Sequence, residues 1–278
     1  MFARALAGQL APALGQPVRV ENVAGAAGLL AAQAAARAAP DGYTLVLIQS
    51  GLLWLQAIDP KREMLRELVP VARLAHSPLV LVVRAESPHA TLAELIATVR
   101  ARPGRLSFGS GGLGSPSHIV VAEMAHRLPD FDVIHIPYNG AADSAVALMR
   151  GDVDFEVGVL GAVLALIRNG RLRALAVTGA NRLALLPVVP TLSEGAAPGL
   201  VIEPWGGMAM PAHAPPDAVA RLGALLPRVL EAPALSTLMA QLGLVADYGE
   251  STAFALQIAR ELQLERERAR RLGLVTRN

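Results

Sequence analysis

Residues 107–118 read SFGSGGLGSPSH, and this stretch shows how the chain is organised. Its apolar start predicts a strand over residues 106–109, and Ser115 followed by Pro116 is typical of the N-cap and first position of a helix. A strand that passes through a glycine-rich loop into a helix is a repeating unit of α/β folds. The stretch therefore predicts a parallel sheet whose strand ends carry loops that lead into helices.

Strands and helices alternate on both sides of this stretch. We expect strands at residues 17–23, 43–49, 71–74, 79–83, 133–137, 153–157 and 172–178. We expect helices at residues 2–14, 28–39, 91–100, 115–128, 142–149, 161–168 and 253–272, with helices dominating from residue 217 onward. This alternation predicts βαβ units and parallel sheets.

The two sets of alternating elements predict two α/β lobes. We assign residues 1–85 and 206–278 to the first lobe and residues 86–205 to the second. A chain that crosses twice between two lobes is typical of a hinged binding protein with a cleft at the carboxyl ends of its sheets. The chain opens on a helix where such a sheet should open on a strand, so we expect lobe 1 to lack its first β-strand in this sequence.

Composition excludes several function classes. The 278 residues carry a formal net charge of +2, are 4% aromatic and include no cysteine. We therefore expect no nucleic-acid partner, no disulfide and no thiolate chemistry. The longest apolar run, residues 157–167, is shorter than the ~20 residues of a membrane span. The histidines have no zinc-binding spacing and no serine lies in a G-x-S-x-G motif, so we expect no metal, no cofactor and no catalytic residue.

Gly109, Gly111 and Gly114 spell the G-x-G-x-x-G pattern of dinucleotide-binding turns. That pattern also requires an acidic residue at the end of the next strand, where this chain has Tyr138 and Asn139. Asp130 and Asp132 precede that strand and should lie at the opposite edge of the sheet. We therefore interpret the loop as a site for another anion, held by backbone N–H groups and serine hydroxyls.

Three predicted strand ends, near residues 50, 110 and 138, carry a loop with glycine or serine that leads into a helix. Free N–H groups at a helix N-terminus attract anions through hydrogen bonds and the helix dipole. We therefore predict that a small carboxylate is recognised by amides and hydroxyls at these loops. The candidate ligand-binding residues are Ser50, Gly51, Ser110, Gly111, Gly112, Ser115, Ser117, Tyr138, Asn139, Gly140 and Ala141.

Five blocks in order give the chain a family resemblance: residues 20–51, 107–118, VIHIPYNGA at 133–141, GDVDF at 151–155, and 169–195. The sequence resembles the Bug (Bordetella uptake gene) or TctC-like solute receptors of tripartite tricarboxylate transporters. The resemblance implies a two-lobed, type II periplasmic-binding-protein (Venus-flytrap) fold and a small organic acid, such as a di- or tricarboxylate, as ligand. It also implies a periplasmic location, a signal peptide on the full-length protein and delivery to membrane permease subunits. We expect a monomer.

The same resemblance places the family's ligand contacts on the strand-end residues named above. His118 matches the family's Ser-His at the helix start, where the imidazole could contact ligand or hydrogen-bond across the helix start. In some members, an acidic residue that binds a ligand amine occupies the position of Gly158. Its absence here argues against an amino-acid ligand, although Glu156 points to the same strand face. Residues 22–28, NVAGAAG, replace the family's N-R-P-G-A-G-G, and Met1 aligns inside the family's first helix.

Two other functions stay open at this level. A sensory binding protein would have the same pocket but a signalling partner. A cytosolic α/β enzyme would use the glycine loop at residues 109–114 for a nucleotide. The transport receptor is the function that both the loops and the resemblance favour, and a receptor of this kind is not an enzyme.

Overall fold

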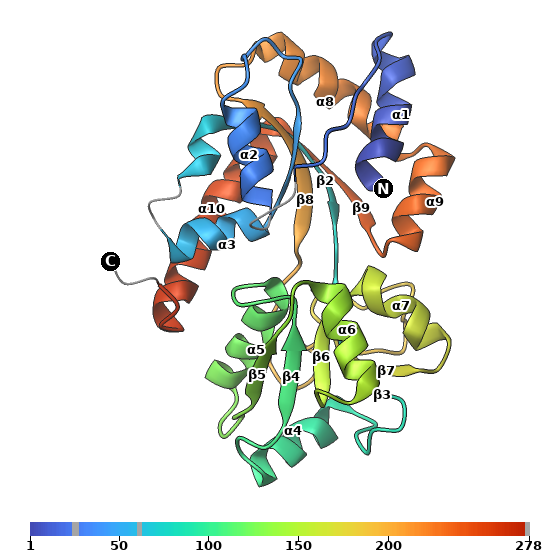
Figure 1. Ribbon diagram of the computed structural model, residues 1–278, viewed down its shortest axis with the longest axis vertical. Coiled ribbons are helices and arrows are strands. Elements are labelled where there is room, and N and C mark those ends of the chain that lie inside the picture. Colours follow the sequence, from blue (N-terminus) through green and yellow to red (C-terminus); the bar gives the residue numbers. More distant parts are fainter. Residues whose placement is uncertain (24–27, 60–62, 276–278) are drawn as a thin grey trace. The chain divides into compact units, whose positions relative to one another are not determined.

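The computed structural model describes residues 1–23, 28–59 and 63–275 (Figure 1). It forms two compact units, and this two-lobed α/β fold confirms the prediction. Unit 1 contains Met1–His76 and Trp205–Asn278, and unit 2 contains Ser77–Pro204. Residues 77–85 therefore lie in unit 2 and not in the first lobe as expected, because β3 (Leu79–Arg84) pairs with two strands of the second sheet. Trp205, which we assigned to the second lobe, lies in unit 1, because it begins β8 (Trp205–Pro211).

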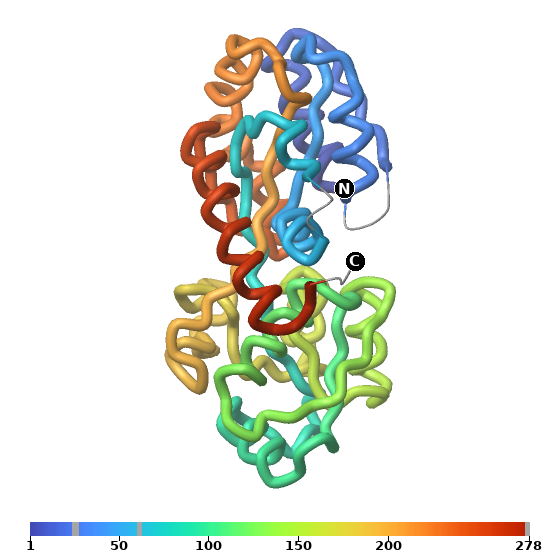
Figure 2. The backbone as a smooth tube through the Cα atoms, turned by 90° about the vertical axis from the view of Figure 1, so that its left-hand side faces the viewer, coloured from blue at the N-terminus to red at the C-terminus, as the bar shows by residue number. Residues whose placement is uncertain are grey.

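The sheet of unit 1 has four strands in the order β1-β8-β2-β9. They are β1 (Val46–Gln49), β2 (Leu68–His76), β9 (Val245–Glu250) and β8. Every pair is antiparallel, whereas the alternation of elements predicted parallel pairing. The prediction fails here because β8 and β9 come from the C-terminal part of the chain and run against the early strands. Figure 2 follows this return, with the orange and red C-terminal elements in the same unit as the blue N-terminal ones.

Helices cover the sheet of unit 1. They are α1 (Phe2–Leu14), α2 (Leu29–Ala36), α3 (Gly51–Ile58), the 3₁₀ helix η2 (Met64–Glu67), α8 (Pro216–Leu230), α9 (Pro233–Gln241) and α10 (Ser251–Arg271). α1 ends at Gly15, whose φ of 68° is the left-handed conformation that glycine adopts most readily. Across the described ranges, none of the helices is both long and apolar enough to cross a membrane.

The first part of unit 1 departs from the predicted elements. Residues 17–23 are not a strand, and no described strand precedes β1 in the chain. A strand pattern alone cannot form a ladder, because the backbone groups also need a partner. Of the alanine- and glycine-rich segment at 22–28, residues 24–27 lie outside the described residues.

The sheet of unit 2 has five strands in the order β5-β4-β6-β3-β7 (Figure 1). The strands β4 (Ser107–Ser110), β5 (Ile134–Pro137) and β6 (Phe155–Val159) are parallel, as predicted. β3 runs antiparallel to both β6 and β7 (Leu172–Val177). The helices of the unit are α4 (Leu92–Ala101), α5 (Pro116–Arg127), α6 (Ala141–Arg150) and α7 (Leu160–Arg168).

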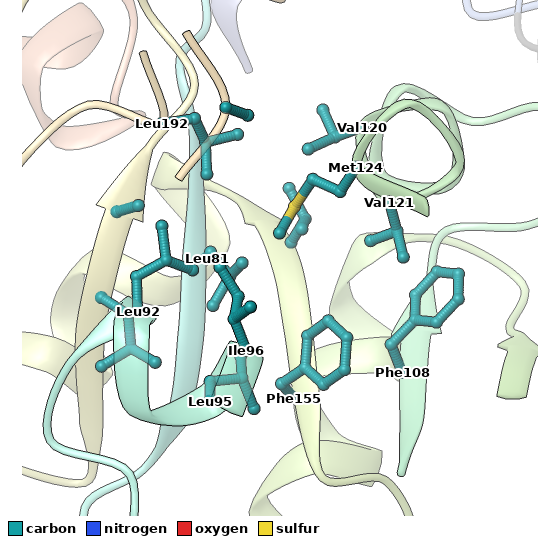
Figure 3. Close-up of a cluster of buried hydrophobic side chains, with 14 of the residues drawn as sticks. Leu81, Leu92, Leu95, Ile96, Phe108, Val120, Val121, Met124, Phe155 and Leu192 are labelled. Carbon is teal, nitrogen blue, oxygen red and sulfur yellow. The ribbon is translucent and has the colours of Figure 1, made fainter. Parts of the chain in front are cut away.

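Both faces of the unit 2 sheet are buried, and each has its own core. One face packs on α4 and α5 and contains Phe108, Phe155 and Met124, which belong to the single core cluster drawn in Figure 3. The other face packs on α6 and α7 and includes Val82 and Leu148. Because side chains alternate along a strand, a doubly covered strand is apolar throughout, which explains the continuous LVLVV of β3.

Candidate functional site

The carboxyl ends of β4, β5 and β6 meet at one edge of the unit 2 sheet. Ser110 at the end of β4 is in register with Pro137 at the end of β5. Each of these strands then leads into a helix, α5, α6 or α7. Parallel strands with helices on both faces place their carboxyl-end loops side by side, which is where ligands bind in such sheets.

The two predicted loops of unit 2 lie against each other at this edge. The backbone N–H of Tyr138 donates to the carbonyl of Ser110 at 3.0 Å. A methyl group added at Gly111 would lie 3.3 Å from the nitrogen of Ala141, and one at Gly112 would lie 3.4 Å from the carbonyl oxygen of Tyr138. Glycine at both positions therefore allows the loop after β4 to approach the start of α6 closely.

The start of α6 offers backbone N–H groups that the helix itself does not use. Its N-cap is Gly140, with a φ of 120° and no side chain to accept a hydrogen bond. The first turn of any helix has N–H groups without a carbonyl partner inside the helix, here those of Ala141, Ala142 and Asp143. These donors and the positive end of the helix dipole favour an anion at this position.

The start of α5 is already capped. Ser115 is its N-cap, and the Ser115 hydroxyl accepts a hydrogen bond from the N–H of His118 at 3.4 Å. Pro116 occupies the first helical position and has no N–H to donate. Both features agree with the helix start predicted from the sequence. Of the two helix starts, α6 therefore has the more available amides.

His118 fastens the glycine loop. Its Nδ1 accepts a hydrogen bond from the N–H of Gly114 at 3.1 Å, so the neutral ring carries its proton on Nε2. The His118 ring stacks on that of His135 with centroids 4.3 Å apart, and His135 stacks in turn on Phe108 at 4.7 Å. Of the two roles left open for His118, the structure shows the hydrogen bond across the helix start.

Burial sets the charge of this histidine pair. Desolvation and then the neighbouring His135 imidazole lower the pKa of His118 to about 4. Desolvation also lowers the pKa of His135. Both rings are therefore neutral at neutral pH, and they contribute hydrogen bonds and packing to the loop without adding positive charge.

The predicted serines of the loop after β4 differ in their access to solvent. Ser110 is fully buried, and its hydroxyl accepts from the N–H of Gly112 at 3.1 Å and lies 2.7 Å from Nε2 of His135. Ser117 is buried as well. Ser115 and the glycines are partly exposed. The two buried serines thus support the loop from inside unit 2, while Ser115 and the loop glycines reach the surface in part.

The predicted residues of the α6 side lie closer to the surface. Tyr138 and Gly140 are partly exposed and Asn139 is exposed. Gly158 on β6 is buried, and a methyl group there would lie 2.6 Å from Cγ1 of Val163. Gly158 therefore allows α7 to pack closely on the sheet.

The aspartates that a dinucleotide fingerprint would need are at the wrong edge. The carbonyl of Asp132 accepts from the N–H of Gly104 at 3.0 Å, before β4 and β5 begin. Strand ends and strand starts lie at opposite edges of a parallel sheet. This placement agrees with the interpretation that the glycine loop is not a dinucleotide site.

In unit 1, Ser50 and Gly51 form the turn from β1 into α3. The N–H of Ser50 donates to the carbonyl of Trp205 at 3.0 Å, and the Ser50 hydroxyl accepts from the N–H of Trp205 at 3.3 Å. Trp205 is a core residue, packed edge-to-face on Phe254 with its Nε1 donating to Glu261 at 2.6 Å. The Ser50 hydroxyl thus has a structural partner within unit 1.

Glu156 was not among the predicted site residues. It lies on β6 in register with Gly109, is fully buried, and has no hydrogen-bond partner for either carboxylate oxygen among the described residues. Burial raises the pKa of Glu156 to about 7. The nearby Ser144 hydroxyl has a smaller, opposite effect on this pKa, although the two side chains are not in hydrogen-bonding geometry. The signal in the sequence is a lone glutamate in the apolar strand FEVGV.

Comparison with known proteins finds a family model and several relatives that match this chain. A family model described as the tripartite tricarboxylate transporter family receptor matches residues 2–274. Protein BugT of Bordetella pertussis is 36% identical over 241 residues, which cover 84% of this chain and 73% of BugT. A protein of Cupriavidus necator is 33% identical over 276 residues, covering 98% and 82% of the two chains.

Solved structures show the same fold. The periplasmic binding protein BugD is 27% identical with a TM-score of 0.86, covering 99% of this chain and 93% of BugD. An R. palustris protein with adipate is 26% identical with a TM-score of 0.86, covering 98% and 92%. MatC from Rhodopseudomonas palustris with bound malate is 29% identical with a TM-score of 0.81, covering 96% and 92%. From the family match, these relatives and the geometry of its strand-end loops, the chain belongs to the tripartite tricarboxylate transporter receptor family.

Proposed function

We propose that the protein is a periplasmic receptor that binds a small organic acid, a di- or tricarboxylate, and delivers it to the membrane permease of a tripartite tricarboxylate transporter. The observation that carries the proposal is the uncapped start of α6 beside Gly111. The solved relatives with adipate and with malate support the class of ligand. The full-length protein would reach the periplasm through a signal peptide.

The chemistry of the two loops suits an anion. Residues 110–117 and 138–143 contain no lysine or arginine, so a carboxylate would be held by N–H dipoles and hydroxyls. Each helix-end interaction is worth ~0.3–1 kcal/mol at the surface and more where water is excluded. Neutral donors of this kind bind an anion without the high desolvation cost of a buried cation.

The predicted contacts divide into two groups under this proposal. The backbone at Gly111 and Gly112 and the start of α6 would contact the carboxylate, with Ser115, Tyr138 and Asn139 at the rim. The buried His118, Ser117 and Gly158 would hold the loops in place. Ser50 and Gly51 of unit 1 stay proposed contacts through the family motif.

One substitution tests the amide site directly. Ala141→Pro removes a single N–H at the first helical position, where α5, α8 and α9 of this chain carry proline. Ala141→Ser is the matched control, because it keeps that N–H. Isothermal titration calorimetry with malate, adipate and citrate measures the affinity of each protein.

We expect at least one acid to bind, and the Ala141→Pro variant to bind it ~10-fold or more weakly, as for loss of a hydrogen bond to a charged group. Ala141→Ser should stay within about twofold of the parent chain, as expected when the backbone donor is unchanged. Equal affinity of the parent and Ala141→Pro proteins would remove α6 from the site. A response to NAD or ATP without a response to any acid would contradict the receptor.

A further inference from the structure

The carboxyl of Glu156 is a buried acid without a hydrogen-bond partner among the described residues of unit 2. Its neighbours on the sheet are Gly109 of β4 and Val82 of β3, and neither has a polar side chain. Above it, the Ser144 hydroxyl is also buried and without a hydrogen-bond partner among the described residues. A buried polar group without a partner costs free energy, so its presence calls for an explanation.

The position of this carboxyl relates it to the proposed site. Ser144 lies one helical turn after Ala141, whose N–H belongs to the uncapped start of α6. A methyl group at Gly158 would lie 3.4 Å from Oε1 of Glu156, so the carboxyl occupies the space over that glycine. Glu156 therefore sits beneath the same helix start that would hold the anion.

No positive charge compensates Glu156 within the described part of the chain. The charged or titratable groups on the surrounding elements are Tyr138, Asp143, Asp152, Arg84, and Arg150 and Arg168 in the last turns of α6 and α7. Arg84 pairs with Glu86 at 3.1 Å and donates to the backbone carbonyls of Leu148 in the C-terminal part of α6 and of Val153 before β6. Asp143 and Asp152 are exposed acids, and on α7 the apolar Val163 shares the space over Gly158 with the carboxyl. An ionised Glu156 would thus stand in a buried environment without a partner of opposite charge among the described residues.

We propose that Glu156 couples ligand binding to a proton: an organic anion binds at the start of α6 only while the Glu156 carboxyl is neutral. The inference rests on the proposed function. Two negative charges in a region of low dielectric repel each other strongly, and the buried one has no water to screen it. The neutral carboxyl removes that repulsion and can donate its proton to a neighbouring oxygen.

The direction of the pH dependence follows. Burial raises the pKa of Glu156 to about 7, and a bound anion nearby raises it further. Below that pH the free protein already carries the proton, so binding takes up none. Above it, binding must take up a proton, and the affinity falls by up to ~10-fold for each pH unit.

Calorimetry in two buffers with different ionisation enthalpies measures the proton uptake, with adipate as the probe at pH 6.5 and 8.5. We expect uptake approaching one proton at the higher pH and much less at the lower one. Glu156→Gln should abolish both the uptake and the pH dependence of the affinity. Glu123→Gln is the matched control, because Glu123 is equally buried but lies on α5 and pairs with Arg127 at 3.1 Å. It should keep the uptake.

Unchanged proton uptake in Glu156→Gln would overturn the coupling. A second measurement, on the free protein, separates this result from a failure of the proposed function. The infrared difference between the parent chain and Glu156→Gln should contain a protonated carboxyl band at pH 6.5 that disappears at higher pH. If no acid binds but this band is present, the function is wrong and Glu156 is a neutral buried acid; if the band is absent at pH 6.5, the inference is wrong.

Discussion

The two faces of the unit 2 sheet keep titratable groups neutral in opposite ways. On the α5 face, His118 and His135 are stacked and resist gaining a proton. On the α6 and α7 face, Glu156 is buried and resists losing one. The same physical cause, desolvation of the charged form, acts on a base in one case and on an acid in the other.

The difference shows how a site for an anion can be built without a cation. Positive charge near the loops comes from the backbone dipoles at the start of α6, while the side chains below stay uncharged. The histidine face has satisfied hydrogen bonds, through Gly114 and Ser110. On the other face, the Glu156 carboxylate and the Ser144 hydroxyl have no hydrogen-bond partner within the described ranges. The first face therefore supports the loop, and the second contains a carboxyl, that of Glu156, whose protonation state can change.

The largest expected effect is on the support of the histidine stack. Phe108 is buried between His135 and Phe155, with ring centroids 4.7 and 5.7 Å away. Phe108→Ala should lower the free energy of unfolding by ~3–5 kcal/mol, the range for buried phenylalanines. Urea denaturation measures this loss. A loss below ~1 kcal/mol would mean that the stack is not part of the core.

Glu156→Gln should change how stability depends on pH. The pKa of Glu156 is raised from 4.5 to about 7 on folding, so the parent chain loses stability as the pH rises through this range, by about 3 kcal/mol in all. The glutamine variant has no such group and should lose that component. Urea denaturation at pH 5 and pH 8 compares the two proteins. Parallel profiles would show that Glu156 is ionised in the folded state.

His118→Asn should show the opposite sign. The pKa of His118 is lowered from 6.5 to about 4 on folding, so the parent chain loses stability as the pH falls through this window. The loss should be about 2–3 kcal/mol, because part of the shift depends on the charge of His135. Thermal unfolding between pH 4 and 7 should be flatter in the variant, whose side-chain oxygen can still accept from Gly114. An equally steep profile would assign the acid sensitivity to other groups.

The smallest effect concerns the start of α5. Ser115→Ala removes the cap that accepts from the N–H of His118, and the expected loss is ~1 kcal/mol. Ser115→Asp, which can still cap, should restore most of it. Thermal unfolding checks both variants. A neutral Ser115→Ala would mean that the 3.4 Å contact contributes little.

Local signals predicted the elements of unit 2 well. The dipeptide Ser115-Pro116 marks the start of α5, because N-cap and first-turn preferences depend on a few neighbouring residues. Unit 1 was harder. The strand β9 was missed because most of its residues are exposed and it pairs with β2, which is distant in the sequence. Ser50 is the N-cap of α3, as its residue type indicates, but it makes no side-chain cap there because its hydroxyl accepts from the N–H of Trp205.

The candidate site was predictable only in outline. Parallel strands share an edge, so the meeting of the loops at Gly111 and Ala141 follows from the fold. The roles within the loops depend on contacts that spacing does not show. The stacking of His118 on His135 joins two segments, and a buried glutamate can be paired, as Glu123 is, or unpaired, as Glu156 is.

We propose that backbone amides at the α6 edge of unit 2 hold a carboxylate. Amide NMR during titration with malate tests it most directly. We expect saturable shifts of the N–H signals of Gly111, Gly112 and Ala141 with one dissociation constant. Saturable shifts confined to another surface, such as the apolar groove lined by Val219 and Tyr248 in unit 1, would contradict it.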